Sequence, residues 1–250
     1  MNLDSKFIVG RLAERIDVTD DLAVFRIKPE EACHFIAGQY ATLGVVRDGK
    51  VIERAYSVAS SPYEPLLEFF IELVPDGRLT PSLFDLRAGD TLSVRRRFSG
   101  RFVLDTTSKT HHLMAATVTG IAPFTSILRT YAVDAEAGRT APMTFTVLHG
   151  ASRSWELGTY RMEMEELQKR VPNLTYVPTI SRCMEDSEWR GELGRVEDVL
   201  RKHADALPLE ESHLSAYLCG HPQMIENARG VLLRSRVAPE RIHSEKYFTL

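Results

Sequence analysis

The sequence predicts an N-terminal antiparallel β-barrel followed by a doubly wound, parallel-sheet α/β domain. The first hundred residues contain short runs of β-branched and aromatic residues separated by turn signals, as in a barrel. This rhythm changes after about Asp105-Thr106-Thr107-Ser108, where apolar runs begin to alternate with helical patterns. Such alternation is typical of a parallel sheet covered on both faces. We therefore expect one domain over residues 1–104 and a second over residues 105–250.

The first domain is expected to contain six strands and one short helix. Turn signals such as Asp48-Gly49 and Pro75-Asp76-Gly77 separate the strands, and their regular spacing favours a barrel. The helix is predicted at Pro81–Leu86. The predicted strands are Phe7–Asp17, Leu22–Lys28, Tyr40–Val46, Val51–Ala59, Leu67–Val74 and Thr91–Arg96.

The second domain is expected to alternate strands with helices. The predicted strands are His112–Thr117, Met143–His149, Leu174–Ile180 and Ser215–Cys219, with Arg241–Phe248 compatible with a last strand. The predicted helices are Pro123–Ala135, Thr159–Arg170, Arg195–His203 and Pro222–Arg234. Ligands of open α/β sheets bind beyond the carboxyl ends of the strands. The segments there contain glycine, hydroxyl groups or arginine, which favours a nucleotide site over plain loops: Thr117–Pro123, His149–Arg153, Ser181–Arg182 and Cys219–Pro222.

Composition excludes several classes of protein. A net charge of -3 over 250 residues, with neither half basic, argues against nucleic-acid binding. The three cysteines, Cys33, Cys183 and Cys219, lack C-x-x-C spacing, so no metal site or disulfide framework is expected. No apolar run approaches the roughly 20 residues of a membrane span, and no signal core is present at the N-terminus. We expect a cytoplasmic monomer.

The run Arg54-Ala55-Tyr56-Ser57 is the first candidate for chemistry. On a strand, Arg54 and Tyr56 share a face, so a guanidinium able to grip a diphosphate stands beside a flat aromatic ring. Ser57 adds a hydroxyl that can donate or accept a hydrogen bond. Taken alone, a run of this kind is more often a half-exposed strand that contains an ordinary arginine.

Six motifs together resemble the ferredoxin–NADP reductase family, in particular its bacterial, FAD-containing ferredoxin/flavodoxin reductases. Each motif is weak alone, but all six follow the family's order on the expected strands and turns over nearly the whole chain. They are Gly38-Gln39-Tyr40, Arg54-Ala55-Tyr56-Ser57, Gly77-Arg78-Leu79-Thr80, Thr117–Pro123, Cys219-Gly220-His221-Pro222-Gln223-Met224 and Glu245-Lys246-Tyr247-Phe248.

The resemblance assigns flavin-binding roles to the first domain. Arg54 would hold the FAD pyrophosphate, Tyr56 would pack on the flavin with Ala55 between them, and Ser57 would lie beside N5. Gly77, Leu79 and Thr80 match the second flavin motif, in which amides opening a short helix, with a hydroxyl, hold phosphate. A plain hairpin turn at Pro75-Asp76-Gly77 is the alternative.

The resemblance also implies a hydride-transfer site. Ser57, Cys219, Glu245 and Tyr247 match its positions, and Phe248 matches an aromatic residue that lies against adenine. Tyr247 would stack on the flavin and move aside for nicotinamide. Hydride transfer needs geometry and electrostatics from the protein rather than a nucleophile. The alternatives are an edge strand that buries Tyr247 in the core and a structural thiol at Cys219.

The nicotinamide cofactor is expected to be NADPH. Thr119, Gly120 and Pro123 match the family's nucleotide loop. Ser181-Arg182 and Arg195 match positions that meet the 2′-phosphate, for which arginine is suited. Either arginine alone is also compatible with a plain surface residue.

Two departures from the family pattern affect this site. The nucleotide loop normally reads T-G-T-G, whereas this chain has Val118 in place of the first glycine. Valine disfavours positive φ, so we expect weaker or shifted binding. An arginine expected three residues after His149 is replaced by Ser152, and the adjacent Arg153 is the candidate substitute.

Three consecutive arginines, Arg95, Arg96 and Arg97, are a candidate docking patch for an acidic carrier protein. The alternative is a solvated edge that deters strand pairing. His111 and His112 have no partners at metal-ligand spacing and are interpreted as solvated or strand-start residues.

The resemblance thus implies an FAD-dependent reductase that passes electrons between NADPH and ferredoxin or flavodoxin. One alternative is an NADH-preferring reductase component of an oxygenase. Another is a non-catalytic flavin-binding sensor or adaptor, in which Val118 closes the nicotinamide site.

Overall fold

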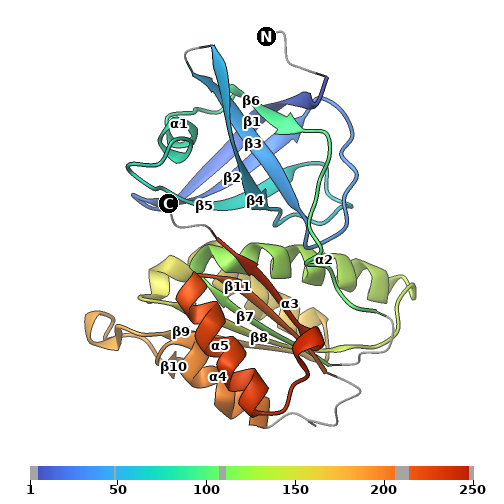
Figure 1. The fold of residues 1–250 in the computed structure, drawn as a ribbon, viewed down its shortest axis with the longest axis vertical. Helices are drawn as coiled ribbons and strands as arrows, with labels where there is room; N and C mark the ends of the chain where they lie inside the picture. The colour runs from blue at the N-terminus through green and yellow to red at the C-terminus, as the bar shows by residue number, and fades with distance from the viewer. Residues whose placement is uncertain (1–4, 48, 107–110, 206–213, 248–250) are drawn as a thin grey trace.

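The N-terminal domain of the computed structural model is a curled antiparallel sheet. The structure describes residues 5–47, 49–106, 111–205 and 214–247. The strands are β1 (Phe7–Thr19), β2 (Leu22–Pro29), β3 (Tyr40–Arg47), β4 (Lys50–Ser57), β5 (Leu67–Glu72) and β6 (Thr91–Arg95), in the order β4-β3-β6-β1-β2-β5. The short helix α1 (Thr80–Phe84) packs against this sheet (Figure 1). Alternating buried residues of the strands fill the interior of the barrel.

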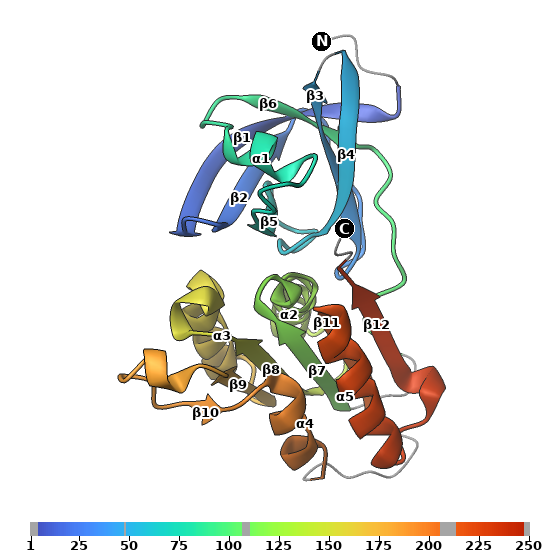
Figure 2. The ribbon, with the colours of Figure 1, turned by 60° about the vertical axis from the view of Figure 1, so that its left-hand side comes forward.

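The C-terminal domain is a parallel sheet between two layers of helices. Its strands are β7 (His111–Thr117), β8 (Thr144–Ala151), β9 (Leu174–Ile180), β10 (Glu192–Leu193), β11 (Leu214–Gly220) and β12 (Ile242–Lys246), in the order β10-β9-β8-β7-β11-β12. One face packs on α2 (Ala122–Glu136) and α3 (Gly158–Arg170). The other packs on α4 (Val196–Asp205) and α5 (Pro222–Arg234) (Figure 2). Among the described helices, none is long and apolar enough to cross a membrane.

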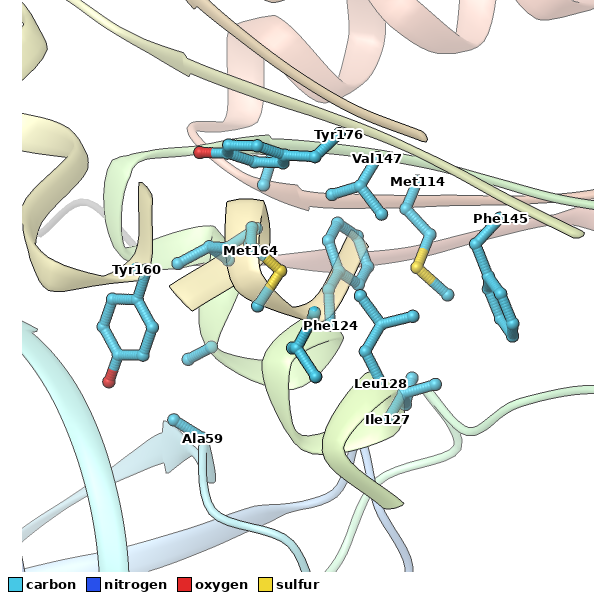
Figure 3. Close-up of a cluster of buried hydrophobic side chains, with 14 of the residues drawn as sticks. Ala59, Met114, Phe124, Ile127, Leu128, Phe145, Val147, Tyr160, Met164 and Tyr176 are labelled. Atoms are coloured by element: carbon cyan, nitrogen blue, oxygen red, sulfur yellow. The ribbon is translucent and has the colours of Figure 1, made fainter. Parts of the chain in front are cut away.

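Helices α2 and α3 also form the contact between the domains. The largest buried cluster joins residues of both helices to barrel residues such as Ala59, which Figure 3 shows beside α2 and α3. Phe70 and Phe102 of the barrel belong to the same cluster. Phe102 stacks against Phe124 of α2 at 5.7 Å between ring centroids. Because one apolar core crosses the boundary, the orientation of the two domains is set by side-chain packing.

A network of charges borders this apolar contact. Arg129 of α2 donates to Glu68 of β5 at 2.9 Å and to Glu163 of α3 at 2.5 Å. Glu68 is 4% exposed and also accepts from Arg26 at 2.8 Å and from the Tyr160 hydroxyl at 3.0 Å. Burial alone would raise the pKa of Glu68, but the two guanidinium groups lower it. This carboxylate is therefore charged and paired from both domains.

The fold class predicted from the sequence is confirmed, and one alternative interpretation of its details was wrong. β6 lies between β3 and β1, so Arg95–Arg97 does not mark an edge strand. Strand β7 begins at His111, which agrees with the interpretation of His111 and His112 as solvated or strand-start residues, and His112 is buried and stacks on Phe145. Strand β10 was not predicted, because two residues carry no periodicity.

Candidate active site

Three of the four predicted catalytic side chains meet where the barrel faces the sheet. Ser57, the last residue of β4, donates its hydroxyl to Oε1 of Glu245 at 2.6 Å. Glu245 lies on β12, directly opposite Cys219 of β11 in the parallel register. The two domains thus each contribute to one cluster, at the carboxyl ends of β11 and β12.

Tyr247, the fourth predicted residue, adjoins this cluster. Its amide donates to the Gly220 carbonyl at 3.2 Å, and its hydroxyl donates to the Thr119 carbonyl at 3.0 Å. The ring packs against the large apolar cluster between the domains. Tyr247 therefore connects β12 to the loop after β7. Phe248 lies outside the described residues.

Burial decides the protonation of this cluster. It raises the pKa of Glu245, an effect that the hydrogen bond from Ser57 opposes. It also raises the pKa of the Cys219 thiol well above its usual value, so the sulfur is not a thiolate near neutral pH. The pKa of Tyr247 is likewise raised well above its ordinary range, first by burial. These groups can donate or hold protons, but they do not form a nucleophilic site.

The predicted flavin motif lies on β4, the edge strand of the barrel sheet that ends at Ser57. Arg54 is exposed and donates to its neighbour's carbonyl, that of Glu53, at 2.9 Å. Ala55 is exposed, and Tyr56 is half-buried against the barrel core. An exposed guanidinium, a small residue and an aromatic ring along one edge fit a flat, diphosphate-bearing group.

The second flavin motif forms a tight turn into α1. A Cβ on Gly77 would lie 2.8 Å from the Val74 carbonyl oxygen, so only glycine fits there. Leu79 is buried in the barrel core. The Thr80 hydroxyl accepts from the Val74 amide at 2.9 Å and donates to the Val74 carbonyl at 3.1 Å. This hydroxyl therefore already has partners within the turn.

Val118 keeps a glycine-like backbone in the nucleotide loop. Its φ is 42°, in the left-handed region that β-branched residues avoid. The Val118 carbonyl lies 2.9 Å from Nε2 of His149, whose Nδ1 lies 3.1 Å from the Tyr176 hydroxyl. Because a carbonyl only accepts, Nε2 carries the proton and Nδ1 accepts from tyrosine. Burial lowers the pKa of His149 to about 4, so the ring is neutral near pH 7.

Close packing explains the other residues of this loop. A Cβ on Gly120 would lie 2.3 Å from the Cys219 carbonyl oxygen, and one on Gly220 would lie 2.2 Å from Oγ1 of Thr117. Thr119 is buried. Pro123 is the second residue of α2, in the first turn, where proline is tolerated because its missing amide has no partner within the helix. The loops after β7 and β11 are thereby held against each other beside Glu245.

The predicted phosphate-binding arginines leave one edge of the sheet from neighbouring strands. Ser181 and Arg182 follow β9, and their amides donate to the carbonyls of Ala151, the last residue of β8, and of Ser152. Arg195 follows β10. Leu193 of β10 pairs with Ile180 of β9, and each arginine comes two residues after its member of this pair, so Arg182 and Arg195 leave the sheet at the same level.

Arg153 shares a carboxylate with Arg182 and is engaged by two carboxylates in all. It donates to Glu185 at 2.6 Å through Nε and to Glu156 at 3.1 Å through Nη1. Arg182 lies 3.7 Å from the same Glu185 carboxylate. Glu185 belongs to no motif, and sequence reasoning missed it, as it missed Tyr176 and the role of His149.

The candidate docking arginines are largely paired with carboxylates of the barrel. Arg95 donates to both oxygens of Glu53, at 2.8 and 2.5 Å, and Arg96 pairs with Glu31 at 2.5 Å. Arg97 is exposed. Within the part of the chain that the structure describes, no group of three or more His, Cys, Asp or Glu side chains is placed to hold a metal ion.

Comparisons of the sequence and the fold with known proteins identify the family of this chain. Residues 9–104 match the family model described as an oxidoreductase FAD-binding domain, and residues 114–230 match that of an oxidoreductase NAD-binding domain. The chain is 34% identical over 198 residues to the flavodoxin/ferredoxin–NADP reductase of Escherichia coli (strain K12), over 78% of this chain and 77% of that protein. This chain belongs to the ferredoxin–NADP reductase family. It is an oxidoreductase with FAD- and NAD(P)-binding domains.

Two further relatives show how far the family fold extends. A crystal structure of a ferredoxin NADP+ reductase from Neisseria gonorrhoeae, with bound FAD and NADP, matches with a TM-score of 0.85 and 27% identity, over 98% of this chain and 100% of that one. The reductase component DmpP of phenol 2-monooxygenase from Pseudomonas sp. (strain CF600) is 30% identical over 244 residues, which are 96% of this chain and 65% of DmpP. The ferredoxin–NADP reductase fold thus includes this chain together with an oxygenase reductase.

Proposed function

We propose that this reductase-family chain transfers electrons between NADPH and a small one-electron carrier protein, ferredoxin or flavodoxin. The observation that carries the proposal is the meeting of Ser57, Cys219 and Glu245 beside Tyr247, from both domains. Bound FAD would supply the chemistry, because a flavin accepts a hydride and releases electrons singly. The chain itself supplies binding, orientation and exclusion of water.

Each residue of the cluster has a role that follows from its contacts. Ser57 presents a hydroxyl fixed by Glu245, and Glu245 can hold or release a proton because burial raises its pKa. Cys219 is fully buried beside Glu245, and its raised pKa keeps the thiol neutral, so it would back the nicotinamide site without adding charge. Tyr247 packs against the apolar cluster between the domains and would have to shift for a second planar ring to enter.

Flavin binding is proposed for the motifs of the barrel. Arg54 would hold the pyrophosphate, with Ala55, Tyr56 and Ser57 along the ring system. Leu79 and Thr80 would contribute backbone amides, and Gly77 would allow the turn that presents them, since the Gly77 amide and the Thr80 hydroxyl have partners within the turn. Phe248 is proposed to lie against adenine.

NADPH binding is proposed for the carboxyl edge of the parallel sheet. Thr119, Gly120 and Pro123 would approach the pyrophosphate. Ser181, Arg182, Arg195 and Arg153 would hold the 2′-phosphate, because three guanidinium groups there favour an anion.

The carrier protein is proposed to dock on the barrel, with charge steering the encounter. Of the three arginines at Arg95–Arg97, the exposed Arg97 is the one we propose for contact with an acidic partner. We also propose a monomer in the cytoplasm, where a reducing environment would keep Cys33, Cys183 and Cys219 as the free thiols they are in the structure.

The second candidate is an NADH-preferring reductase component of an oxygenase, favoured by the similarity to DmpP. The two candidates differ at the 2′ position of the nucleotide: NADPH carries a phosphate there for the arginines to bind, and NADH carries an uncharged hydroxyl. The third candidate is a flavin-binding sensor. Neither NADPH nor NADH would reduce the flavin bound to such a sensor.

The test is anaerobic stopped-flow reduction of the purified, FAD-loaded protein. We expect NADPH to bleach the flavin absorbance faster than NADH, and reduced protein to pass electrons to ferredoxin or flavodoxin. Arg182→Ala should weaken NADPH binding about tenfold, the factor for ~1.4 kcal/mol, with NADH unchanged. Arg201→Ala, on the exposed face of α4, is the control. Faster reduction by NADH would favour the oxygenase component, and no reduction would favour the sensor.

A further inference from the structure

Glu185 lies between two of the arginines at the carboxyl edge of the sheet. Its Oε2 accepts from Nε of Arg153 at 2.6 Å and also pairs with the Nη2 of that guanidinium. Its Oε1 lies 3.7 Å from Nη1 of Arg182. One carboxylate therefore faces both cations, and its hydrogen bond is the first cause of the raised pKa of Arg153.

The backbone fixes this carboxylate near the arginines. Glu185 lies in η3 (Cys183–Glu185), and its amide donates to the Arg182 carbonyl at 3.0 Å. The next residue, Asp186, accepts from the Ser154 amide at 3.1 Å, which ties the η3 turn to the loop after β8. The η3 loop therefore presents Glu185 to Arg153 across the gap between two strand ends.

Two carboxylates contact Arg153, and they differ in how easily an anion could replace them. Glu156 is 20% exposed and accepts from the backbone amides of Ser152 and Arg153 at 2.9 and 3.3 Å, so it holds the loop itself. Glu185 is 47% exposed, and its side chain contacts the two guanidinium groups. Exposed pairs of this kind are weak, so Glu185 is the carboxylate that can swing away.

We propose that Glu185 is a specificity-determining residue that occupies the anion-binding face of Arg153 and Arg182, so that the 2′-phosphate of NADPH must displace it. This inference rests on the proposed function, because it concerns the same nucleotide site. NADH carries a hydroxyl at this position and gains nothing by displacing a carboxylate. Glu185 therefore narrows the preference of the site for NADPH over NADH.

The test is isothermal titration of the FAD-loaded Glu185→Gln variant with 2′,5′-ADP and with 5′-AMP, two probes that differ only in the 2′-phosphate. We expect Glu185→Gln to tighten 2′,5′-ADP binding about fivefold, which corresponds to ~1 kcal/mol, and to leave 5′-AMP binding within twofold. Glu188→Gln is the matched control, since it removes an equal charge three residues further along the same loop and should change neither affinity.

The outcomes separate this inference from the proposed function. Weaker or unchanged 2′,5′-ADP binding in Glu185→Gln, or equal tightening in Glu188→Gln, would overturn the inference. If wild type binds the two probes equally and Glu185→Gln gains a preference for 2′,5′-ADP, the role of Glu185 stands and the proposed use of NADPH fails. Thermal denaturation of each variant verifies that the fold is retained.

Discussion

At the scale of single residues, Val118 shows how this chain accommodates its departure from the family loop. A β-branched residue at positive φ is strained by roughly 1–2 kcal/mol. The hydrogen bond from His149 and packing against two apolar clusters hold it there. The left-handed turn is therefore preserved without glycine, and weaker nucleotide binding stays a prediction.

His149 should make stability depend on pH. Its pKa of about 4 in the folded chain lies below the value of 6.5 that an exposed histidine has, so unfolding takes up a proton between these values. Its stabilising effect is complete above pH 6.5 and is lost as pH falls towards 4, by about 3 kcal/mol in total. Urea denaturation between pH 4 and pH 7 measures this loss.

The variant His149→Asn isolates this contribution. It removes the buried titrating ring, so its stability should fall less steeply with pH over the same interval, although it is lower at pH 7. Parallel pH profiles for wild type and His149→Asn would show that the histidine does not titrate as inferred.

The sequence was informative about some site residues and silent about others. Ser57, Cys219, Glu245 and Tyr247 occur in motifs, and the structure brings them together. The contacts among Val118, His149 and Tyr176 depend on the register of three parallel strands, which no local pattern encodes.

At the scale of elements, periodicity predicted most strands and helices to within a few residues. Helix α5 was predicted at its observed bounds, since proline opens it and its apolar face is regular. The order of the strands in each sheet could not be predicted from the sequence. That order places β6 in the interior and pairs Arg95 and Arg96 with carboxylates on β4 and beyond β2.

The interlocked loops after β7 and β11 make Gly120 irreplaceable. In Gly120→Ala, the new methyl group would overlap the Cys219 carbonyl, so one loop must shift. We expect a loss of about 1–3 kcal/mol in the free energy of unfolding, measured by urea denaturation. Weaker binding of 2′,5′-ADP should accompany it.

Gly230→Ala is the matched control. Gly230 lies inside α5, where a Cβ meets only the end of the flexible Arg234 side chain at 3.3 Å. This variant should gain up to ~1 kcal/mol from helix propensity. A neutral Gly120→Ala would mean that the two loops are not packed as described.

At the scale of the whole molecule, the contact between the domains decides whether the site exists. Apolar packing by Phe102 and Phe124 favours contact between the domains but does not by itself select one orientation. The charged groups around Arg129 do, because they have defined partners in both domains. A buried carboxylate that loses its cations is strongly disfavoured, so alternative orientations of the domains are penalised.

Glu68→Gln tests this network. The change preserves shape but leaves Arg129 and Arg26 without their shared carboxylate, so we expect a loss of about 3 kcal/mol in the free energy of unfolding at pH 7. Because the pKa of Glu68 is lowered in the folded chain, its contribution is present above the ordinary value of 4.5 and is lost as pH falls further. The gap between wild type and variant should therefore shrink in acid.

Glu166→Gln provides the comparison for that experiment. Glu166 forms an exposed pair with Lys169 on α3, so its loss should stay within ~1 kcal/mol. If urea denaturation gives the two variants similar losses, the network does not fix the domains.

The hydrogen bond between Ser57 and Glu245 joins positions 188 residues apart, and this has a consequence for biosynthesis. At ribosomal speeds of roughly 5–20 residues per second, the serine is made on the order of 10–40 s before its partner. During that interval a nascent barrel could acquire flavin, but its hydroxyl would still face water. Under the proposed function, redox chemistry would therefore wait until translation has supplied β12.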